Sequence, residues 1–383
     1  MITYAFVLKL LLSSGSSAQG KSSVRIAWRT PLGMAYRLRW PASVIQNRVA
    51  AVTNESVVAV DQHSGKKSWE TRFGGKVYGP ASGPGAFFVC FDGKWSSYNK
   101  LAESPSVCSL NPSDGKLIWK TELNGYPTGE PAFGDSGLVC VGASLWKPGP
   151  TDQPGFYNDA GQLIGIDAKT GSLRWRVIGG LFGVPRVIPG RIVVCESTDK
   201  PNSSYVTCVR TRDGRVLWRK QSDGFSPGHE GEGIPMPVVS STGLVFVGTS
   251  KSVFAFDASG KQLWQHAEVA LPVVVSSSLY VATRTGLEAL DPYSGREHWS
   301  KSYHDYGIYP FVLGPRGNLY CSSPGPHLGD QAVAALDSSN GDLKWRLRVG
   351  GSQPIYSAQV VGDNGLVFVV TDDRDLIAIQ TEK

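Results

Sequence analysis

The sequence lacks the features that mark several common protein classes. Only 18% of its 383 residues are charged, and no apolar run reaches the roughly 18 residues that a membrane-spanning helix requires. The net charge of +6 is small for this length, so it does not indicate nucleic-acid binding. No HExxH, CxxC, Walker A or GxSxG motif is present. The sequence therefore does not match the metalloproteases, redox proteins, nucleotide-binding enzymes and serine hydrolases that these motifs identify.

Glycine and proline are abundant instead. The chain has 45 Gly and 24 Pro, about 18% of its residues against a usual level of about 12%. Both residues interrupt helices, so this composition argues against a helical bundle. The apolar fraction of 41% is too high for a disordered chain. The composition therefore favours a folded chain rich in turns.

One pattern recurs along the chain: an alternating apolar run, an Asp, a Gly a few residues later and a Trp four residues after that Gly. Two weaker copies have Asn111 or Arg210 in place of the Asp. The five full copies contain Asp61 and Trp69, Asp167 and Trp175, Asp257 and Trp264, Asp291 and Trp299, and Asp337 and Trp345.

Each copy predicts a β-hairpin. The alternating run is typical of a strand, the Asp accepts backbone N–H bonds to open a tight turn, and the Gly takes the positive-φ position. The residue two positions before the Asp is Ala or Gly in every full copy, which we interpret as a socket for a neighbouring Trp ring. The Trp residues assigned to this docking are Trp28, Trp69, Trp119, Trp175, Trp218, Trp264, Trp299 and Trp345.

The two ends of the chain complete one another. Trp28 lacks a hairpin partner, whereas the C-terminal segment 376–380 is a motif strand without a Trp. The eight Trp residues recur about every 45 residues, a period typical of propeller blades, and the two terminal pieces add up to one more period. We therefore predict an all-β, eight-bladed β-propeller of four-stranded blades over residues 21–383, closed by strands from both termini.

The segment Asp167-Ala168-Lys169-Thr170-Gly171-Ser172-Leu173-Arg174-Trp175 resembles the pyrroloquinoline-quinone (PQQ) repeat. Eight-bladed propellers of this type include the quinoprotein alcohol dehydrogenase-like enzymes and the BamB-like scaffold lipoproteins. The resemblance covers residues from about 24 to 380. It implies the fold but leaves the function open, because catalysts and pure scaffolds share the repeat.

One face of the predicted ring carries the long insertions. With strands A to D counted from the axis outward, the A–B and C–D links are short turns, whereas five B–C or D–A links are long: 92–104, 143–161, 221–234, 302–308 and 323–331. We call the face with these links the loop face. Function usually sits on such loops. The candidate partner-binding residues there are Trp95, Tyr98, Trp146, Tyr157, His229, Glu230, His304, Tyr306 and His327.

Several functions fit this face. Aromatics among sparse polar groups suit a protein contact, so we expect a monomeric, non-catalytic scaffold for protein partners; a glycan-binding module is a further alternative. The other alternative is an oxidoreductase, because the quinoprotein resemblance implies PQQ, calcium and adjacent cysteines. No adjacent cysteines exist, and the chain is short for such an enzyme.

Candidate metal ligands are few. Carboxylates of the kind that bind calcium are present at Glu230, Glu232 and Asp305. Imidazoles of the kind that bind a transition metal are present at His229, His304 and His327. Solvated loop residues are the simpler interpretation, so we expect neither metal nor cofactor.

The six cysteines have no metal-binding spacing. Cys195 and Cys208 fall on adjoining predicted strands of one blade and should share a face, so a disulfide is possible if the register sets them opposite each other. A bridge between Cys90 and Cys108 is disfavoured by strand parity. Buried free thiols are the alternative for all six.

Residues 1–20 resemble a signal peptide. An apolar stretch precedes Ser16-Ser17-Ala18, a small-residue cleavage site that would leave Gln19 as the first mature residue. We therefore expect an exported protein in the secretory pathway, periplasm or extracellular space. An organelle lumen is the alternative, since the first acidic residue is Glu55.

Overall fold

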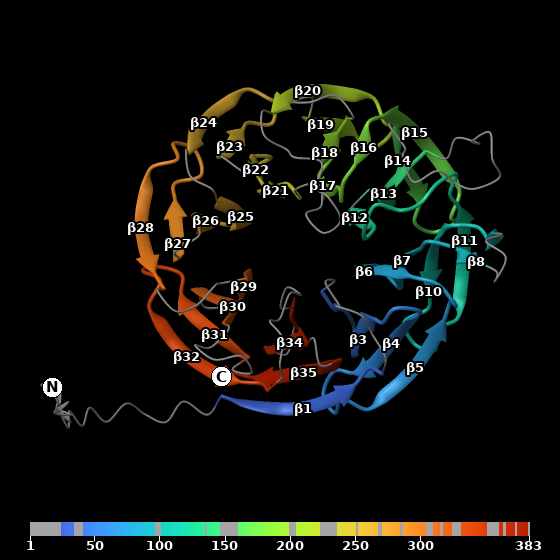
Figure 1. The fold of residues 1–383 in the computed structure, drawn as a ribbon, viewed down its shortest axis with the longest axis horizontal. Helices are drawn as coiled ribbons and strands as arrows, with labels where there is room; N and C mark the ends of the chain where they lie inside the picture. The colour runs from blue at the N-terminus through green and yellow to red at the C-terminus, as the bar shows by residue number, and fades with distance from the viewer. Residues whose placement is uncertain are drawn as a thin grey trace, which may run out of the picture.

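The protein forms an all-β ring around a central axis (Figure 1). Eight antiparallel sheets follow one another around this ring, which confirms the eight-bladed propeller. Within the described residues no helix is long and apolar enough to cross a membrane. The structure is a computed structural model, and it describes residues 24–33, 41–95, 101–134, 136–145, 160–198, 204–222, 236–249, 252–266, 270–283, 286–303, 309–314, 317–323, 331–350, 360–362, 365–371 and 374–381.

Blades 1 to 4 each place their strands in chain order from the axis outward. Blade 4 has a fifth strand, because its inner strand is split in two. The strands are β2 (Ser43–Ile45), β3 (Arg48–Val52), β4 (Ser56–Asp61) and β5 (Lys67–Arg72); β6 (Val77–Gly83), β7 (Ala86–Phe91), β10 (Ser106–Leu110) and β11 (Leu117–Glu122); β12 (Ala132–Gly134), β13 (Leu138–Ser144), β14 (Gly161–Asp167) and β15 (Leu173–Gly179); and β16 (Leu181–Phe182), β17 (Arg186–Ile188), β18 (Arg191–Ser197), β19 (Ser204–Arg210) and β20 (Val216–Ser222).

An additional hairpin, β8 (Lys94–Trp95) with β9 (Leu101–Glu103), belongs to the B–C link of blade 2. Blades 5 to 8 continue the ring. The strands are β21 (Val238–Val239), β22 (Val245–Gly248), β23 (Val253–Phe256) and β24 (Gln262–His266); β25 (Ala270–Val275), β26 (Leu279–Thr283), β27 (Gly286–Leu290) and β28 (Glu297–Ser302); β29 (Tyr309–Gly314), β30 (Asn318–Ser323), β31 (Ala332–Asp337) and β32 (Leu343–Arg348); and β33 (Val360–Val361), β34 (Leu366–Val370), β35 (Asp375–Gln380) and β1 (Arg25–Pro31).

Blade 8 closes the ring with strands from both ends of the chain. Arg25 of β1 lies opposite Gln380 of β35, and Pro31 lies opposite Asp375. Arg29 adds an ion pair to the same partner strand, with its Nη1 2.6 Å from Asp375 Oδ2. The N-terminal strand is therefore the outer strand of a blade whose other three strands come from the C-terminus, as predicted.

The repeated hairpin has the predicted turn. In blade 3, Asp167 Oδ1 accepts hydrogen bonds from the backbone N–H groups of Lys169 and Thr170 at 3.0 and 2.9 Å. Gly171 has a φ of +74°, a backbone conformation that glycine adopts without steric cost. The Asp and the Gly thus close the link between the outer two strands in five residues or so, about the length of a tight hairpin loop.

Each outer strand has a β-bulge at the residue before its Trp. In blade 3, Gly165 pairs with Trp175 while Ile166 pairs with Leu173, so Arg174 is the extra residue. The same shift occurs in the other seven outer strands. Leu173 and Arg174 are consequently both exposed. A bulge of this kind bends and twists an edge strand.

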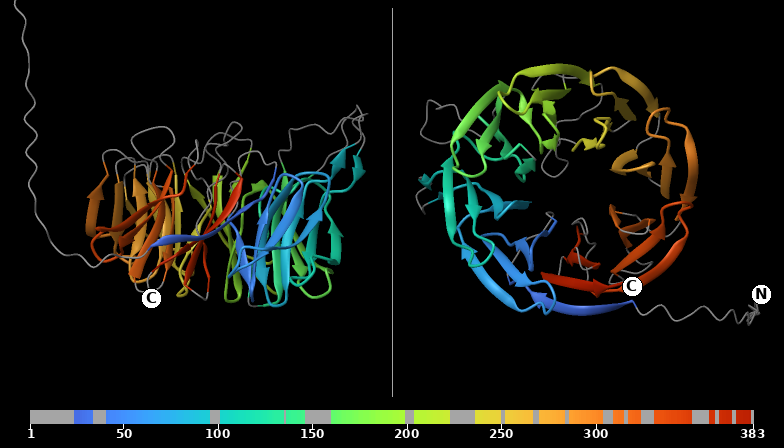
Figure 2. Two further views of the ribbon diagram at one scale, coloured as in Figure 1. Left: turned by 90° about the horizontal axis from the view of Figure 1, so that it is seen from below. Right: turned by 180° about the vertical axis from the view of Figure 1, so that it is seen from behind.

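The core lies between neighbouring blades. One cluster joins Phe88 and Trp119 of blade 2 to Val139 and Ile164 of blade 3, and all four side chains are buried. The strands in the middle of each sheet are covered on both faces, which explains their continuous apolar runs. Figure 2 shows the resulting short cylinder, with the strand ends gathered at its two faces.

Candidate functional site

The strand ends place the links as the sequence predicts. β6 and β7 are joined on one face by Pro84 and Gly85 alone, whereas on the loop face β7 ends at Phe91 and β10 begins only at Ser106. β13 and β14 show the same contrast, since β13 ends at Ser144 and β14 begins at Gly161. The long links therefore leave and rejoin the ring at one face.

Most of the candidate contact residues on these links lie outside the described residues. This holds for Tyr98, Trp146, Tyr157, His229, Glu230, His304, Tyr306 and His327. Trp95 is the exception, because it ends β8 and pairs through its backbone with Leu101 of β9. The sequence did not predict this small hairpin, whose strands are only two and three residues long.

A half-buried carboxyl lies where the same link begins. The backbone N–H of Asp92 donates to the Lys76 carbonyl oxygen at 3.0 Å, and Lys76 Nζ lies 4.8 Å from the centre of the Tyr78 ring. Burial raises the pKa of Asp92 to about 6, although the Lys76 charge opposes the shift. The Asp92 charge in turn helps burial to raise the pKa values of Tyr78 and Tyr126.

We call Lys76, Tyr78, Asp92 and Tyr126 the Asp92 cluster. Tyr126 is held at the end of β13, because its N–H donates to Ser144 Oγ at 2.9 Å and its carbonyl oxygen accepts from the Ser144 N–H at 2.8 Å. A carboxyl that changes charge near pH 6 beside two phenols can donate or accept hydrogen bonds to a ligand, and such shifted groups gather at functional sites. Sequence reasoning missed this cluster, because its members come from three separate links and strands.

A second carboxylate on this face is fully satisfied. Glu196 is buried and accepts hydrogen bonds from Arg219 Nε and Nη2 at 2.9 and 2.8 Å. Thr207 Oγ1 and the Gly180 N–H donate to it as well, at 2.9 and 2.6 Å. The Arg219 guanidinium also stacks 3.6 Å from the Tyr205 ring centre. Because every carboxylate oxygen has partners, this group stabilises blade 4 rather than awaiting a ligand.

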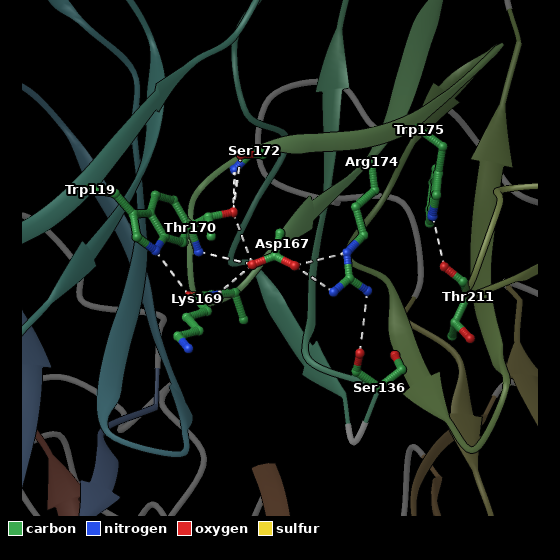
Figure 3. A network of polar contacts seen from close by, with 10 residues as sticks. Trp119, Ser136, Asp167, Lys169, Thr170, Ser172, Arg174, Trp175 and Thr211 are labelled. Atoms are coloured by element: carbon green, nitrogen blue, oxygen red, sulfur yellow. Dashed lines mark hydrogen bonds and ion pairs between the residues drawn. The ribbon is translucent and has the colours of Figure 1, made fainter.

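Trp residues link neighbouring blades, as Figure 3 shows for Trp119 and Trp175. Trp119 Nε1 donates to the carbonyl oxygen of Ala168 at 2.9 Å, and its ring lies where a Cβ on Gly171 would be. The socket predicted at the small residue two before the Asp is corrected here: Gly165 lies opposite Trp175 of its own hairpin, and the turn glycine Gly171 is the residue that meets the ring from the preceding blade. The same indole bond to the turn of the following blade is made by Trp28, Trp69, Trp175, Trp218, Trp264 and Trp299.

A serine, a histidine and an aspartate meet on the opposite face. Ser278 Oγ lies 3.0 Å from His298 Nδ1, and His298 Nε2 lies 3.9 Å from Asp291 Oδ2. The same place in blade 3 is taken by Arg174, which bridges Asp167 and the Ser136 carbonyl oxygen (Figure 3). His298 therefore fills a structural bridging position of the repeat, and this geometry does not make a catalytic triad.

A pocket of about 180 Å³ adjoins this bridge. Its lining includes Ser240, Thr242, Ser276 and Tyr293. Part of this lining is already occupied, since Ser240 Oγ accepts the Leu244 N–H at 2.9 Å and contacts Thr242 Oγ1 at the same distance.

The described residues do not assemble a metal site. No three His, Cys, Asp or Glu side chains among them are grouped as a metal ion requires. The three carboxylates considered as calcium ligands lie outside the described residues; they are Glu230, Glu232 and Asp305.

All six cysteines are free and buried. Cys208 lies opposite Val193, and Cys195 lies opposite Val206, so the register offsets the two thiols by two residues and no disulfide joins them. Cys90 and Cys108 are offset by one residue, and thus lie on opposite faces of their sheet. The bridge considered for Cys195 and Cys208 is therefore not formed.

Comparison with known proteins agrees with this architecture. A family described as outer membrane protein assembly factor BamB matches residues 103–272 and 283–383. The chain belongs to this family. Among curated relatives, tetrathionate hydrolase of Acidithiobacillus ferrooxidans is 25% identical over 237 residues, 58% of this chain and 44% of that protein. BamB of Alteromonas naphthalenivorans is 25% identical over 230 residues, 52% of each chain. The chain thus spans about half the length of these relatives.

Solved structures share the fold at low sequence identity. BamB from Moraxella catarrhalis superposes with a TM-score of 0.67 at 12% identity, covering 93% of this chain and 99% of that one. A quinohemoprotein alcohol dehydrogenase from Pseudomonas putida gives 0.66 at 12% identity, covering 96% and 78%. BamB and a quinohemoprotein alcohol dehydrogenase are therefore matched with nearly the same TM-score, and the likeness establishes the propeller alone.

Proposed function

We propose that this BamB-family propeller is a non-catalytic binding protein that holds a protein partner on its loop face. The asymmetry of the links carries the proposal: the A–B and C–D links are tight turns, whereas long links leave the loop face after β7 and β13. A scaffold with no partner gives no physical reason to lengthen the links of one face only. Loops on a rigid frame are where binding residues concentrate.

The Asp92 cluster supports the same face. It places a titratable carboxyl and two tyrosines at the root of the link that carries Trp95. Aromatic anchors with a few polar groups match the composition of protein interfaces. The curated BamB relative is an assembly factor by name, which favours a protein partner over a small substrate.

The test is a quantitative pull-down from the native source with matched variants. Trp95→Ala, Trp146→Ala and Tyr306→Ala should each lose a partner that the wild-type chain retains, because interface anchors contribute about 2 kcal/mol or more. Lys66→Glu, in a C–D turn of the opposite face, should retain it. All four variants must show the wild-type melting temperature. Loss of the partner by Lys66→Glu alone would place the interface on the other face.

We also propose that the chain is exported, on the basis of the apolar segment before Gln19. Peptide mapping of the mature protein from its native source should find Gln19 at the N-terminus. Recovery of intact Met1 in the cytoplasmic fraction would contradict export.

A further inference from the structure

The outer wall of blades 2 to 4 exposes aliphatic side chains. They belong to the outermost strands β11, β15 and β20, and each is 40–58% exposed. We call this set the outer-wall patch: Leu117, Ile118, Leu173, Ile178, Val216 and Leu217. The three strands that carry it form part of the side wall of the cylinder (Figure 2).

The repeat does not require apolar residues at these places. The bulge before each Trp exposes the two residues that precede it, and other blades fill the same positions with polar side chains. Blade 1 has Lys67 and Ser68 there, and blade 6 has Glu297 and His298. On the described outer strands of the other blades, the one large apolar side chain of similar exposure is Leu343 of blade 7. The apolar choice in blades 2 to 4 therefore calls for another explanation.

The part of the patch on β20 lies among basic residues. Residues 210–220, which include β20, contain five basic residues and one acidic residue. Arg210 forms an ion pair with Asp213, and Arg219 forms one with Glu196. Arg215 and Lys220 are exposed, and neither forms an ion pair within the described part of the chain. Arg215, just before β20, and Lys220, within it, thus lie on either side of Val216 and Leu217 in the sequence.

β20 is also a sheet edge. Among the described strands it pairs with β19 alone, so within this part of the chain its other side presents backbone N–H and C=O groups. An exposed strand edge can accept an additional strand, whose main-chain hydrogen bonds supply affinity while alternate side chains supply specificity. Natural proteins often protect such edges with charge, yet here aliphatic residues lie among the charges.

We propose that an extended, acidic segment of a partner protein adds to the outer edge of β20. Its aliphatic side chains cover Val216 and Leu217, and its carboxylates lie beside Arg215 and Lys220. A peptide fits better than an anionic membrane, because the outer strands curve around the ring and cannot all face one flat bilayer (Figure 1). Lipid also cannot satisfy the hydrogen-bonding groups of a strand edge.

Synthetic peptides of about ten residues, in which Glu alternates with Val, Ile or Leu, test this proposal by fluorescence anisotropy at low and high salt. The alternating peptides should bind about tenfold more tightly than block-ordered peptides of the same composition, a difference of one power of ten in Kd. Peptide binding should slow hydrogen exchange of the β20 amides. The affinity should fall as salt rises.

Matched variants locate the site. Val216→Ser with Leu217→Ser, and separately Arg215→Ser with Lys220→Ser, should weaken peptide binding about tenfold. Leu343→Ser is the control for exposed aliphatics on an outer strand, and Lys261→Ser is the control for Arg215, since both precede their Trp by three residues. Both controls should bind as the wild type does. Trp95→Ala should also bind normally, because this site is independent of the loop face.

Three results would overturn the proposal. One is the failure of every alternating peptide to bind. The second is a control variant, Leu343→Ser or Lys261→Ser, that weakens peptide binding as much as the β20 variants do. The third is binding of vesicles that contain phosphatidylglycerol through Arg215 and Lys220 when the peptides do not bind, which would assign the patch to a membrane surface.

Discussion

The indole nitrogen of Trp175 lies 2.7 Å from the carbonyl oxygen of Thr211, so the outer strand of blade 3 is hydrogen-bonded to the turn of blade 4. The same ring covers Gly214, where a Cβ would approach Trp175 Cε3 to 2.7 Å. Each described turn thus receives the ring of the preceding blade and presents a carbonyl oxygen to it. Seven such bonds, from Trp28, Trp69, Trp119, Trp175, Trp218, Trp264 and Trp299, connect the eight blades in sequence from blade 8 to blade 7. Removing one of these rings should therefore lower the stability of the whole propeller.

Replacement of Trp175 tests this coupling. Trp175→Ala should lower the free energy of unfolding by about 3–5 kcal/mol, the usual cost of deleting a buried aromatic. Trp175→Phe keeps much of the packing, and its loss of the bond to Thr211 should cost about 1 kcal/mol in hydrogen bonding. Urea denaturation of the two variants and the wild type measures both. Equal losses for Ala and Phe would show that packing contributes little at this position.

Gly214 and Gly190 provide a matched pair for the close approach of the ring. Their φ values are +71° and +73°, but a Cβ on Gly190 would meet nothing within 4 Å. Gly190→Ala should therefore cost only the left-handed backbone penalty of about 1–2 kcal/mol. Gly214→Ala should cost about 1–3 kcal/mol more, because the new methyl group overpacks the Trp175 ring. Identical denaturation midpoints for the two variants would contradict the steric account.

The hairpins, the turns and the closure of the ring follow from the sequence because they rest on local, repeated patterns. Asp167 and Gly171 specify their turn within five residues or so, a range that local rules cover. Trp28 and the strand at 376–380 reveal closure because a period can be counted across the ends of the chain. Nothing in this reasoning requires knowledge of how distant strands align.

What the sequence did not predict depends on such alignment. The two-residue offset of Cys195 and Cys208 is a matter of register between β18 and β19, and a slip of even one residue changes every facing pair. The bulge before Trp175 and the Asp92 cluster likewise need positions that only the folded ring provides. Of the candidate contact residues, Trp95 alone belongs to a described strand.

Deletion of residues 376–383 tests ring closure. The truncation removes most of β35, which pairs with both β1 and β34. The truncated chain should unfold at a lower temperature or form oligomers through the freed strand edges. Size-exclusion chromatography and circular dichroism check the outcome. A monomer with unchanged melting behaviour would contradict closure by the terminal strands.

The thiols should be inert in the folded protein. All six cysteines are buried and free, and burial raises the pKa of Cys108 to about 11 and that of Cys321 to about 12. Because the thiolate is the reactive form, alkylation near pH 7 should be slow until the chain is denatured. Denaturation without a reductant should then release six reactive thiols, counted by mass spectrometry. A peptide linking Cys195 to Cys208 would refute the register seen here.

Asp92 should give the protein a pH-dependent stability of defined sign. Its pKa is raised from 3.8 to about 6 by burial, so between about pH 4 and pH 6 the folded protein holds a proton that the unfolded chain releases. The free energy of unfolding should fall as the pH rises through this window, since the native state binds more protons. Asp92→Asn removes the titration, so the stability of the variant relative to the wild type should increase from pH 4 to pH 8. Urea denaturation of both proteins across this range makes the measurement, and the other titrating groups cancel in the difference. A difference that stays constant with pH, or that decreases, would show that Asp92 is ionised in the folded protein at pH 4 as it is in water.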